Sequence, residues 1–241
     1  MPAALGRHAM PVLQNSFFMT SSDTPPKRQP GRPKVPTETR ESILDAAELE
    51  FAAHGYGATA LRNIADRVGI NQSLIRYYFG NKEKLFDEVF RRRGATLSAL
   101  RHAALDSLLG KDPARLTLQA VLHSYLSPQW DLKNSGESGA AFIRLQARLH
   151  AESEQHALRL RSEVYDASVR RYVDVLADLL PHLPKQVISL RMAFLVGTYM
   201  FMLNDLGRVP DFMGPDSAPL AHDAMLAHLV QFLASGFSSQ V

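Results

Sequence analysis

Two short amphipathic stretches separated by one glycine constrain the fold of this chain more than any other feature. In the first stretch, apolar residues recur at spacings of three and four, as on one face of a helix: Leu61, Ile64, Ala65 and Val68. Gly69 follows where that helix must end, because glycine adopts the left-handed conformation without a steric penalty. Asn71 is a favourable N-cap for the next helix, which contains Ile75 and Phe79 as anchors. The pattern predicts a helix-turn-helix unit.

Further helices are predicted on both sides of this unit. Upstream, Ile43, Leu44, Ala47 and Phe51 mark a helix that ends near His54 and Gly55. Downstream, Asn81 caps a fourth helix whose buried side carries Leu85, Phe86, Val89 and Phe90. Thr59 is a candidate N-cap for the first helix of the pair. We expect these helices to pack around one small core. The alternative is a generic helical hairpin, which would also have glycine at its turn.

The second helix of the pair carries hydrogen-bonding side chains on its outer face, including Gln72, Ser73, Arg76 and Tyr77. In a helix-turn-helix domain such a helix enters the DNA major groove while its neighbour braces on the backbone. Residues 25–93 hold 13 Lys and Arg against 9 Asp and Glu, whereas the rest of the chain holds 14 against 15. A local basic excess suits phosphate neutralisation, which indicates DNA as a partner.

The segment before the first helix, residues 25–34, is rich in proline and basic residues and should be disordered in the free protein. Its Gly31-Arg32-Pro33 resembles the core of an AT-hook, in which Arg32 would lie in the minor groove; a solvated linker is the alternative. Residues 1–24 lack the continuous apolar region of a signal peptide, and Met19 is an alternative start. The chain has no cysteine, which fits a cytoplasmic location.

Residues 37–90 resemble the TetR family of transcriptional regulators. The matching pattern is a first helix ending in phenylalanine and glycine, then Thr59, Ile64-Ala65 and Gly69-Ile70, and finally a run from Tyr78 through Asn81 and Lys82 to Leu85. The resemblance implies an all-α chain with an N-terminal helix-turn-helix DNA-binding domain of three or four helices. A larger C-terminal helical domain would bind ligand and dimerise. The expected boundaries are 1–36 for a disordered extension with a basic arm, 37–93 for the DNA-binding domain and 94–241 for the helical domain.

The resemblance also implies which residues approach DNA. Gln72, Ser73 and Leu74 would face base edges, Tyr77 and Tyr78 would touch phosphates, and Lys82 would clamp the backbone. Arg62 would approach a base or a phosphate from the preceding helix, and Thr59, just before that helix, would also contact DNA. The chain departs from the family pattern at Ala60, where a small hydroxyl residue is usual, and at Arg76, which replaces an aromatic residue. The operator can therefore differ from those of other members.

After Gly94 the sequence predicts only helices and loops. A helix starts at Asp112-Pro113 and ends near Ser127-Pro128, followed by a polar loop over 129–138 that contains Trp130. The expected helices then span Gly139–Ala151, Ser153–Leu180, Lys185–Leu206 and Ser217–Phe237, with a break at Pro181–Pro184 and a loop over Gly207–Ser217. The apolar run Met192–Leu203 is too short to span a bilayer, so no membrane association is expected.

The helix from Lys185 is apolar almost all round and therefore needs cover on both sides. We expect it to form, with the last helix, the interface of a homodimer that suits a palindromic DNA operator. A pocket for a small apolar or amphipathic effector is implied by the resemblance, and its candidate lining is Tyr125, Phe142, Leu145, Leu149, Tyr165, Val169, Arg191 and Met192. Arg191 could instead form an ion pair with Asp174 or Asp178.

Enzymatic and metal sites are not indicated. The spacings of His150 with Glu154 and of His222 with His228 do not match a metal site, and no phosphate-binding loop or nucleophile motif occurs. We therefore expect no catalytic residue, no metal and no cofactor. The prediction is a dimeric repressor that occupies a palindromic operator and is released by a small, largely apolar ligand. The alternative is a ligand-independent, weakly specific DNA-binding protein of nucleoid type.

Overall fold

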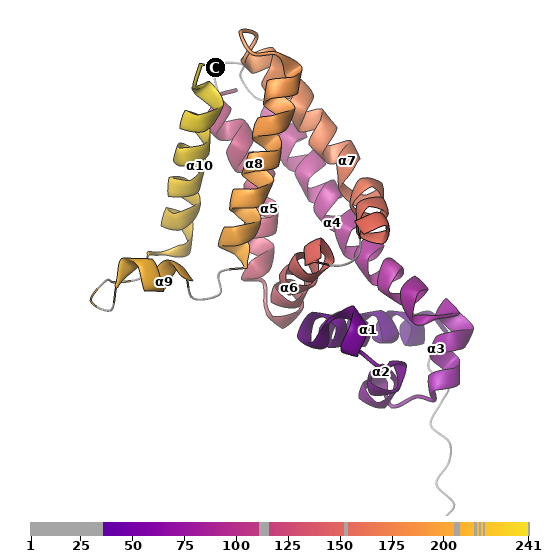
Figure 1. Ribbon diagram of the computed structural model, residues 1–241. Coiled ribbons are helices and arrows are strands. Elements are labelled where there is room, and N and C mark those ends of the chain that lie inside the picture. The colour runs from indigo at the N-terminus through magenta and orange to yellow at the C-terminus, as the bar shows by residue number, and fades with distance from the viewer. Residues whose placement is uncertain are drawn as a thin grey trace, which may run out of the picture. The chain divides into compact units, whose positions relative to one another are not determined.

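The computed structural model describes residues 36–110, 116–151, 154–204, 208–214, 216, 218 and 220–240, and this part of the chain contains helices and no strands (Figure 1). It belongs to one compact unit, Val35–Val241. The predicted all-α class is confirmed. The helices are α1 (Pro36–Ala58), α2 (Leu61–Val68), α3 (Gln72–Phe79), α4 (Lys82–Leu109), α5 (Leu118–Lys133), α6 (Glu137–Ala151), α7 (Glu154–Leu179), α8 (Lys185–Leu203), α9 (Arg208–Met213) and α10 (His222–Ser238).

The helix-turn-helix unit consists of α2 and α3, packed against α1 and the start of α4. The predicted caps are present: Gly69 ends α2 in the left-handed conformation, and the side chains of Asn71 and Asn81 accept from the first turns of α3 and α4. Gly55 has a φ of 79° and breaks α1 near its end, as the sequence predicts. Thr59 was expected to cap α2, but the N-cap is Ala60, which makes no side-chain bond.

Helix α4 joins the DNA-binding unit to the remainder of the fold. It is continuous from Lys82 to Leu109 and passes through residues 93 and 94, where we expected a domain boundary. Its first half contributes Leu85, Phe86, Val89 and Phe90 to a core that also includes residues of α6 and α7. The core of the DNA-binding unit therefore extends into the C-terminal helices, because α6 covers α1 and α7 packs along α4.

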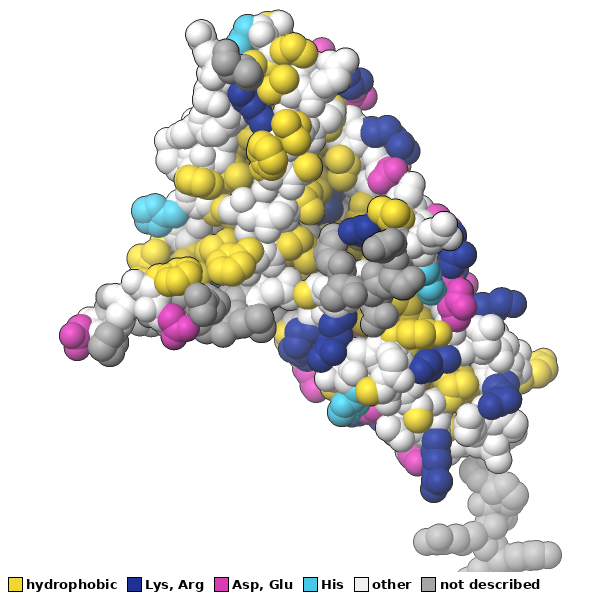
Figure 2. Space-filling model, viewed as in Figure 1, with side chains coloured by type: hydrophobic (Ala, Val, Ile, Leu, Met, Phe, Trp, Pro, Cys, Tyr) yellow, Lys and Arg dark blue, Asp and Glu magenta, His cyan; other side chains and the backbone are white. Residues whose placement is uncertain are grey.

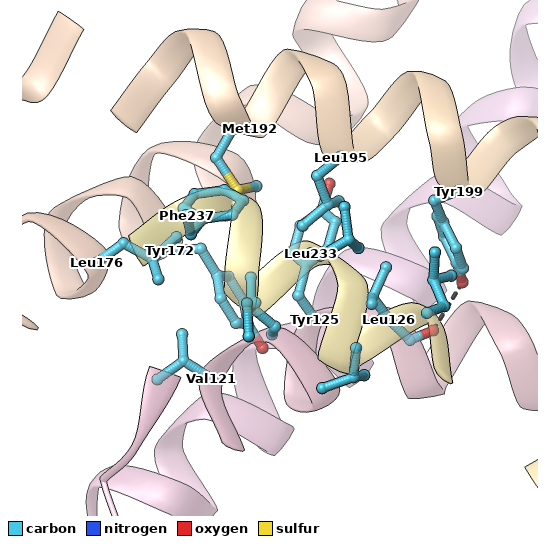
Figure 3. Close-up of a cluster of buried hydrophobic side chains, with 14 of the residues drawn as sticks. Val121, Tyr125, Leu126, Tyr172, Leu176, Met192, Leu195, Tyr199, Leu233 and Phe237 are labelled. Atoms are coloured by element: carbon cyan, nitrogen blue, oxygen red, sulfur yellow. Dashed lines mark hydrogen bonds between the residues drawn. The ribbon is translucent and has the colours of Figure 1, made fainter. Parts of the chain in front are cut away.

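A second core lies between α5, α7, α8 and α10 (Figure 3). Three tyrosines cross it, and the hydroxyls of two of them donate to backbone carbonyls. The Tyr199 hydroxyl donates to the Leu126 carbonyl at 2.6 Å, and the Tyr172 hydroxyl donates to the Arg101 carbonyl at 2.9 Å. Tyr125 packs edge-on against Tyr172, with ring centroids 5.0 Å apart. Satisfying these hydroxyls lets the aromatic rings fill the core without an unpaired polar group.

Helix α5 differs from the sequence prediction. The predicted start at Asp112-Pro113 lies outside the described residues, and the observed helix begins after the N-cap Thr117. It continues through Pro128 to Lys133, so Trp130 lies in a helix and is buried, not in a polar loop. Side chains from other helices donate to carbonyls in the proline-containing turn: Arg101 to Tyr125, and Tyr199 to Leu126. These tertiary contacts, with the burial of Trp130, hold the helix across a residue that ordinarily ends one.

The region before the last helix also differs from the prediction. A short helix, α9, occupies Arg208–Met213 within the expected loop, and α10 begins only at His222. Helix α8 has 19 residues and is long and apolar enough to cross a membrane by length and composition. From the sequence, we considered only the apolar run Met192–Leu203, the second part of this helix, as a possible membrane span. Five of its side chains, Ile188, Met192, Leu195, Tyr199 and Leu203, are buried in the second core. Helix α8 thus contributes one face to this core.

Candidate DNA-binding surface and effector cavity

The recognition helix α3 is anchored from one side only. Ile75 and Phe79 are buried in the first core, whereas Arg76 and Tyr77 point outward and Tyr77 is 81% exposed. At the start of the helix the Asn71 side chain accepts from the Ser73 amide at 2.8 Å. The cap fixes the direction of the first turn, so the helix presents its N-terminal residues and its outer face to a partner.

Most of the residues that we expected to approach DNA share this surface. Ser73, Arg76 and Tyr77 are exposed, and Gln72, Leu74 and Tyr78 are half-buried. The rings of Tyr77 and Tyr78 pack edge-on with centroids 5.4 Å apart. On α2, the side chain of Arg62 is 82% exposed and lies 3.6 Å from Asp66, an ion pair that water screens strongly. Arg32 lies outside the described residues.

Two predicted DNA contacts have structural partners instead. Thr59 is only 2% exposed, and its hydroxyl lies within bonding distance of the carbonyls of Glu50 (3.1 Å) and Gly55 (2.7 Å) in α1. The Lys82 ammonium donates to the carbonyls of Tyr56 (2.8 Å) and Thr59 (3.0 Å), and to a third at Gly57. An ammonium has three protons, so Lys82 is fully engaged in holding the segment between α1 and α2. Both residues position the recognition unit and do not project from it.

An ionic cluster connects α4 to α7 directly behind the recognition unit. The Asp87 side chain is 7% exposed and receives His156 Nε2 at 2.5 Å and Arg159 Nη2 at 3.0 Å, both from α7. Arg91, one turn further along α4, lies 3.3 Å from Asp87 and 2.9 Å from Glu163 of α7. Because a buried carboxylate needs paired charges, Asp87 ties the two helices together at this level.

A second set of polar contacts connects α1 with α4 and α6. Arg148 donates to the carbonyls of Ala52 and Ala53 at the end of α1, and its guanidinium lies against Gly55. Buried Glu48 of α1 accepts two bonds from Arg93 of α4, at 2.7 and 2.9 Å. The DNA-binding unit is thus bound to the C-terminal helices by charged groups as well as by the shared core.

The C-terminal helices line a cavity of about 140 Å³ and an adjacent outer groove of about 560 Å³ between α7 and α8, and the two spaces share the lining residues Arg161, Asp166, Val169 and Val196. Of the predicted effector contacts, Tyr125, Tyr165 and Val169 line the cavity, and Met192 and Val169 line the groove. Phe142, Leu145 and Leu149 do not reach either space, because α6 turns them into the first core. Burial raises the pKa of the Tyr165 phenol, which therefore remains a hydrogen-bond donor at neutral pH.

Arg191 does not occupy the cavity. It donates to the carbonyls of Phe237 (2.6 Å) and Ser239 (2.7 Å), which end α10, and it pairs with neither Asp174 nor Asp178. Asp174 is paired with Lys185 instead, at 2.5 Å. A cation at a helix C-terminus satisfies the last carbonyls and the helix dipole, so the expected ion pair of Arg191 is wrong, and Arg191 is not among the residues that line the cavity or the groove.

The sequence interpretation missed Arg101, which lines the cavity and is 3% exposed. A signal was present: in α4 the buried residues Leu97 and Leu105 lie four positions on either side of it, so Arg101 interrupts an apolar stripe. Its Nε donates to the Tyr125 carbonyl at 3.1 Å, its Nη2 donates to Gln129 Oε1 at 2.8 Å, and its guanidinium lies 3.9 Å from the centre of the Tyr125 ring.

Comparison with known proteins places this chain among bacterial regulators. A model described as "Bacterial regulatory proteins, tetR family" matches residues 43–89, and one described as "Tetracyclin repressor-like, C-terminal domain" matches residues 123–236. The transcriptional repressor AcnR of Corynebacterium efficiens is 24% identical over 152 residues, covering 59% of this chain and 80% of that protein. AcnR of Corynebacterium glutamicum is 35% identical over 90 residues, covering 36% of this chain and 48% of its own length.

Solved structures of related regulators share the fold. A TetR-like transcriptional regulator from Rhodococcus sp. RHA1 has a TM-score of 0.58 at 22% identity, covering 84% of this chain and 97% of its own. The haemolysin II regulator HlyIIR has a TM-score of 0.58 at 18% identity, covering 86% and 100%. The similarity thus extends from the helix-turn-helix unit through the C-terminal helices.

Proposed function

Since this chain belongs to the TetR family of transcriptional regulators, we propose that it is a repressor that occupies a palindromic operator as a homodimer and leaves it when a small effector binds. The observation that carries this proposal is the outward face of α3, where Arg76 and Tyr77 are exposed on a helix capped by Asn71. Such a face reads base edges in the major groove while neighbouring residues contact phosphates. We expect the protein to act in the cytoplasm, where the operator lies.

The dimer interface would form on α8 and α10. Along α8, Leu190, Phe194 and Phe201 are 54%, 62% and 50% exposed, and Phe232 of α10 is 68% exposed. Hydrophobic side chains gather over this part of the molecule in Figure 2. A surface of this kind marks a protein interface, and an interface between two copies places one α3 on each operator half-site.

Release from DNA would start at the cavity between α4, α5, α6, α7 and α8. Arg101 on its wall and the capped start of α4 beside α3 belong to one continuous helix. A ligand that prefers one arrangement of α4 and α7 would therefore change the separation of the two recognition helices. Coupling of this kind requires only a difference in ligand affinity between the two arrangements.

The test is a binding titration of the full-length protein on DNA flanking its own gene, at two salt concentrations and with excess competitor DNA. We expect a tight complex that persists in excess competitor DNA. Gln72→Ala should reduce the binding free energy by about 1–3 kcal/mol, through the loss of discrimination at one operator position. Arg170→Ala, an exposed cation on α7, is the matched control and should bind normally. Equal loss across all sequences, or binding that never exceeds the competitor, would favour the nonspecific nucleoid-type alternative.

A further inference from the structure

Arg101 presents an unusual buried charge. The residue is 3% exposed, yet within the described residues no carboxylate lies within 4 Å of its guanidinium. Its partners are a backbone carbonyl, the amide oxygen of Gln129 and the face of the Tyr125 ring, all of which are uncharged. A buried cation usually has a counter-charge, because desolvation of an isolated ion is costly. Arg101 instead faces a cavity.

The guanidinium also fixes the orientation of the polar groups around that cavity. Arginine only donates, so Gln129 must turn its oxygen toward Arg101 and its NH₂ group toward Gln146. Gln146 in turn donates to the Tyr165 hydroxyl oxygen. Among the bonds of the described residues, the Tyr165 hydroxyl accepts one and donates none, and its raised pKa keeps its proton in place. The chain of bonds therefore ends with a phenolic proton at the cavity that Arg101 lines.

The outer groove has a different character. It shares Val169 and Val196 with the cavity and continues past Val173, Met192 and Ala193 between α7 and α8. The one acid common to both spaces, Asp166, lies 3.5 Å from Arg170 and accepts from Ser162. The site thus joins an inner end with a buried cation and a phenolic donor to an outer groove that has an apolar floor of valine, methionine and alanine side chains and charged side chains around it: Arg161, which also lines the cavity, Asp166, Arg170, Asp174 and Lys185.

We infer that the effector is an amphipathic monocarboxylate whose carboxylate pairs with Arg101 and accepts a hydrogen bond from the Tyr165 hydroxyl, while its hydrocarbon chain lies in the groove along Val169 and Val196. This inference rests on the proposed function, since it names the chemistry of the effector that the cavity would bind. Arginine supplies an ion pair and a phenol supplies a hydrogen bond to a carboxylate, and the ligand supplies the counter-charge that Arg101 lacks among the described residues.

The experiment compares decanoate, decan-1-ol and decyltrimethylammonium as probes, by calorimetric titration of the full-length protein below the aggregation limit of each probe. We expect decanoate to bind at least about tenfold more tightly than the alcohol, because the charged bonds to Arg101 form only with the acid. Arg101→Gln should weaken decanoate binding by about tenfold to a hundredfold and leave the alcohol unaffected. Arg144→Gln, a cation on α6 outside this cavity, is the control and should leave both unchanged.

Tyr165→Phe keeps the test decisive if Arg101→Gln does not fold, because it removes only one hydroxyl from a half-buried ring. It should weaken the binding of decanoate by about fivefold and leave the binding of decan-1-ol unchanged. The inference is overturned if the alcohol or the ammonium probe binds as tightly as decanoate, if decanoate does not bind, or if Tyr165→Phe affects acid and alcohol equally. Operator binding is measured on the same preparations. If the unaltered protein does not bind DNA specifically, the proposed function as a regulator is refuted. If it binds DNA specifically but decanoate and decan-1-ol release it equally, only the inference of a carboxylate effector is refuted.

Discussion

Replacing Asp87 by Asn should weaken the attachment of the DNA-binding unit to α7 with little change in shape. The substitution removes the charge that holds His156 at 2.5 Å and Arg159 at 3.0 Å. Removing one partner of a fully buried ion pair costs about 3–5 kcal/mol. Here the partners are partly hydrated, with Arg159 50% exposed and Arg91 41% exposed, so water compensates much of their charge. We therefore expect a loss of roughly 1–2 kcal/mol after this screening.

Thermal denaturation followed by circular dichroism measures this loss. For a domain of about 200 residues, 1 kcal/mol shifts Tm by about 2–4 °C, so Asp87→Asn should lower Tm by roughly 2–8 °C. Asp166→Asn is the control: its carboxylate is 44% exposed and lies 3.5 Å from Arg170, so the change should remain within about 0.5 kcal/mol.

A double-mutant cycle with Arg159→Met tests whether the energy resides in the contact between α4 and α7. The two changes should be non-additive by at least about 0.5 kcal/mol, because each removes the same interaction. Asp87→Asn should also alter how strongly an effector reduces operator affinity, since Asp87 connects the effector helices to the recognition unit. Additive effects, or an Asp87→Asn protein as stable as Asp166→Asn, would contradict the reasoning.

Three further predictions concern other parts of the chain. Lys82→Met should cost about 1–3 kcal/mol of stability through loss of its carbonyl contacts, while the salt dependence of operator binding stays unchanged. If the slope of the logarithm of the binding constant against the logarithm of the salt concentration became shallower by about 0.9, Lys82 would instead contact a phosphate. Gly55→Ala should destabilise by about 1–3 kcal/mol in chemical denaturation, because φ is 79° and an added Cβ would lie 2.9 Å from Arg148 Nη1, whereas Gly57→Ala, with no atom within 4 Å, should not. Phe194→Glu should give a monomer in light scattering, and an unchanged dimer would exclude α8 from the interface; Leu158→Glu, exposed on α7, is the control.

The parts of the fold that sequence predicted correctly depend on local chemistry. Gly69 ends α2, and Asn71 and Asn81 cap the next two helices, because each cap is formed by groups within a few residues. The anchors Ile75 and Phe79 follow from helical spacing alone. Such signals require no knowledge of the tertiary structure, so the recognition unit could be described before its packing was known.

The structure differs from the sequence expectation where distant partners decide the outcome. Lys82 has the chemistry of a phosphate contact, but the carbonyls that occupy it lie 23 to 26 residues away in the chain. Pro128 is a helix terminator by local rules, yet the burial of Trp130 and donors from Arg101 and Tyr199 maintain α5 through it. Arg191 was placed beside acids by sequence distance, whereas its partners are carbonyls 46 and 48 residues further on.

The arrangement of charge along α4 gives a physical basis for communication between the two sites. Asp87 and Arg101 are fourteen residues apart, which is about four helical turns, so both lie on the side of α4 that meets α7. Asp87 binds α7 through His156 and Arg159 near the recognition unit, while Arg101 meets the cavity wall to which α7 contributes Tyr165. A carboxylate bound between Arg101 and Tyr165 would add a polar bridge between the same two helices, about 21 Å along α4 from Asp87 and on the side of the Arg171–Asp106 ion pair. Because α4 is unbroken from Lys82 to Leu109, we expect a displacement of α4 at the cavity to be carried along the helix to Asp87, next to α3.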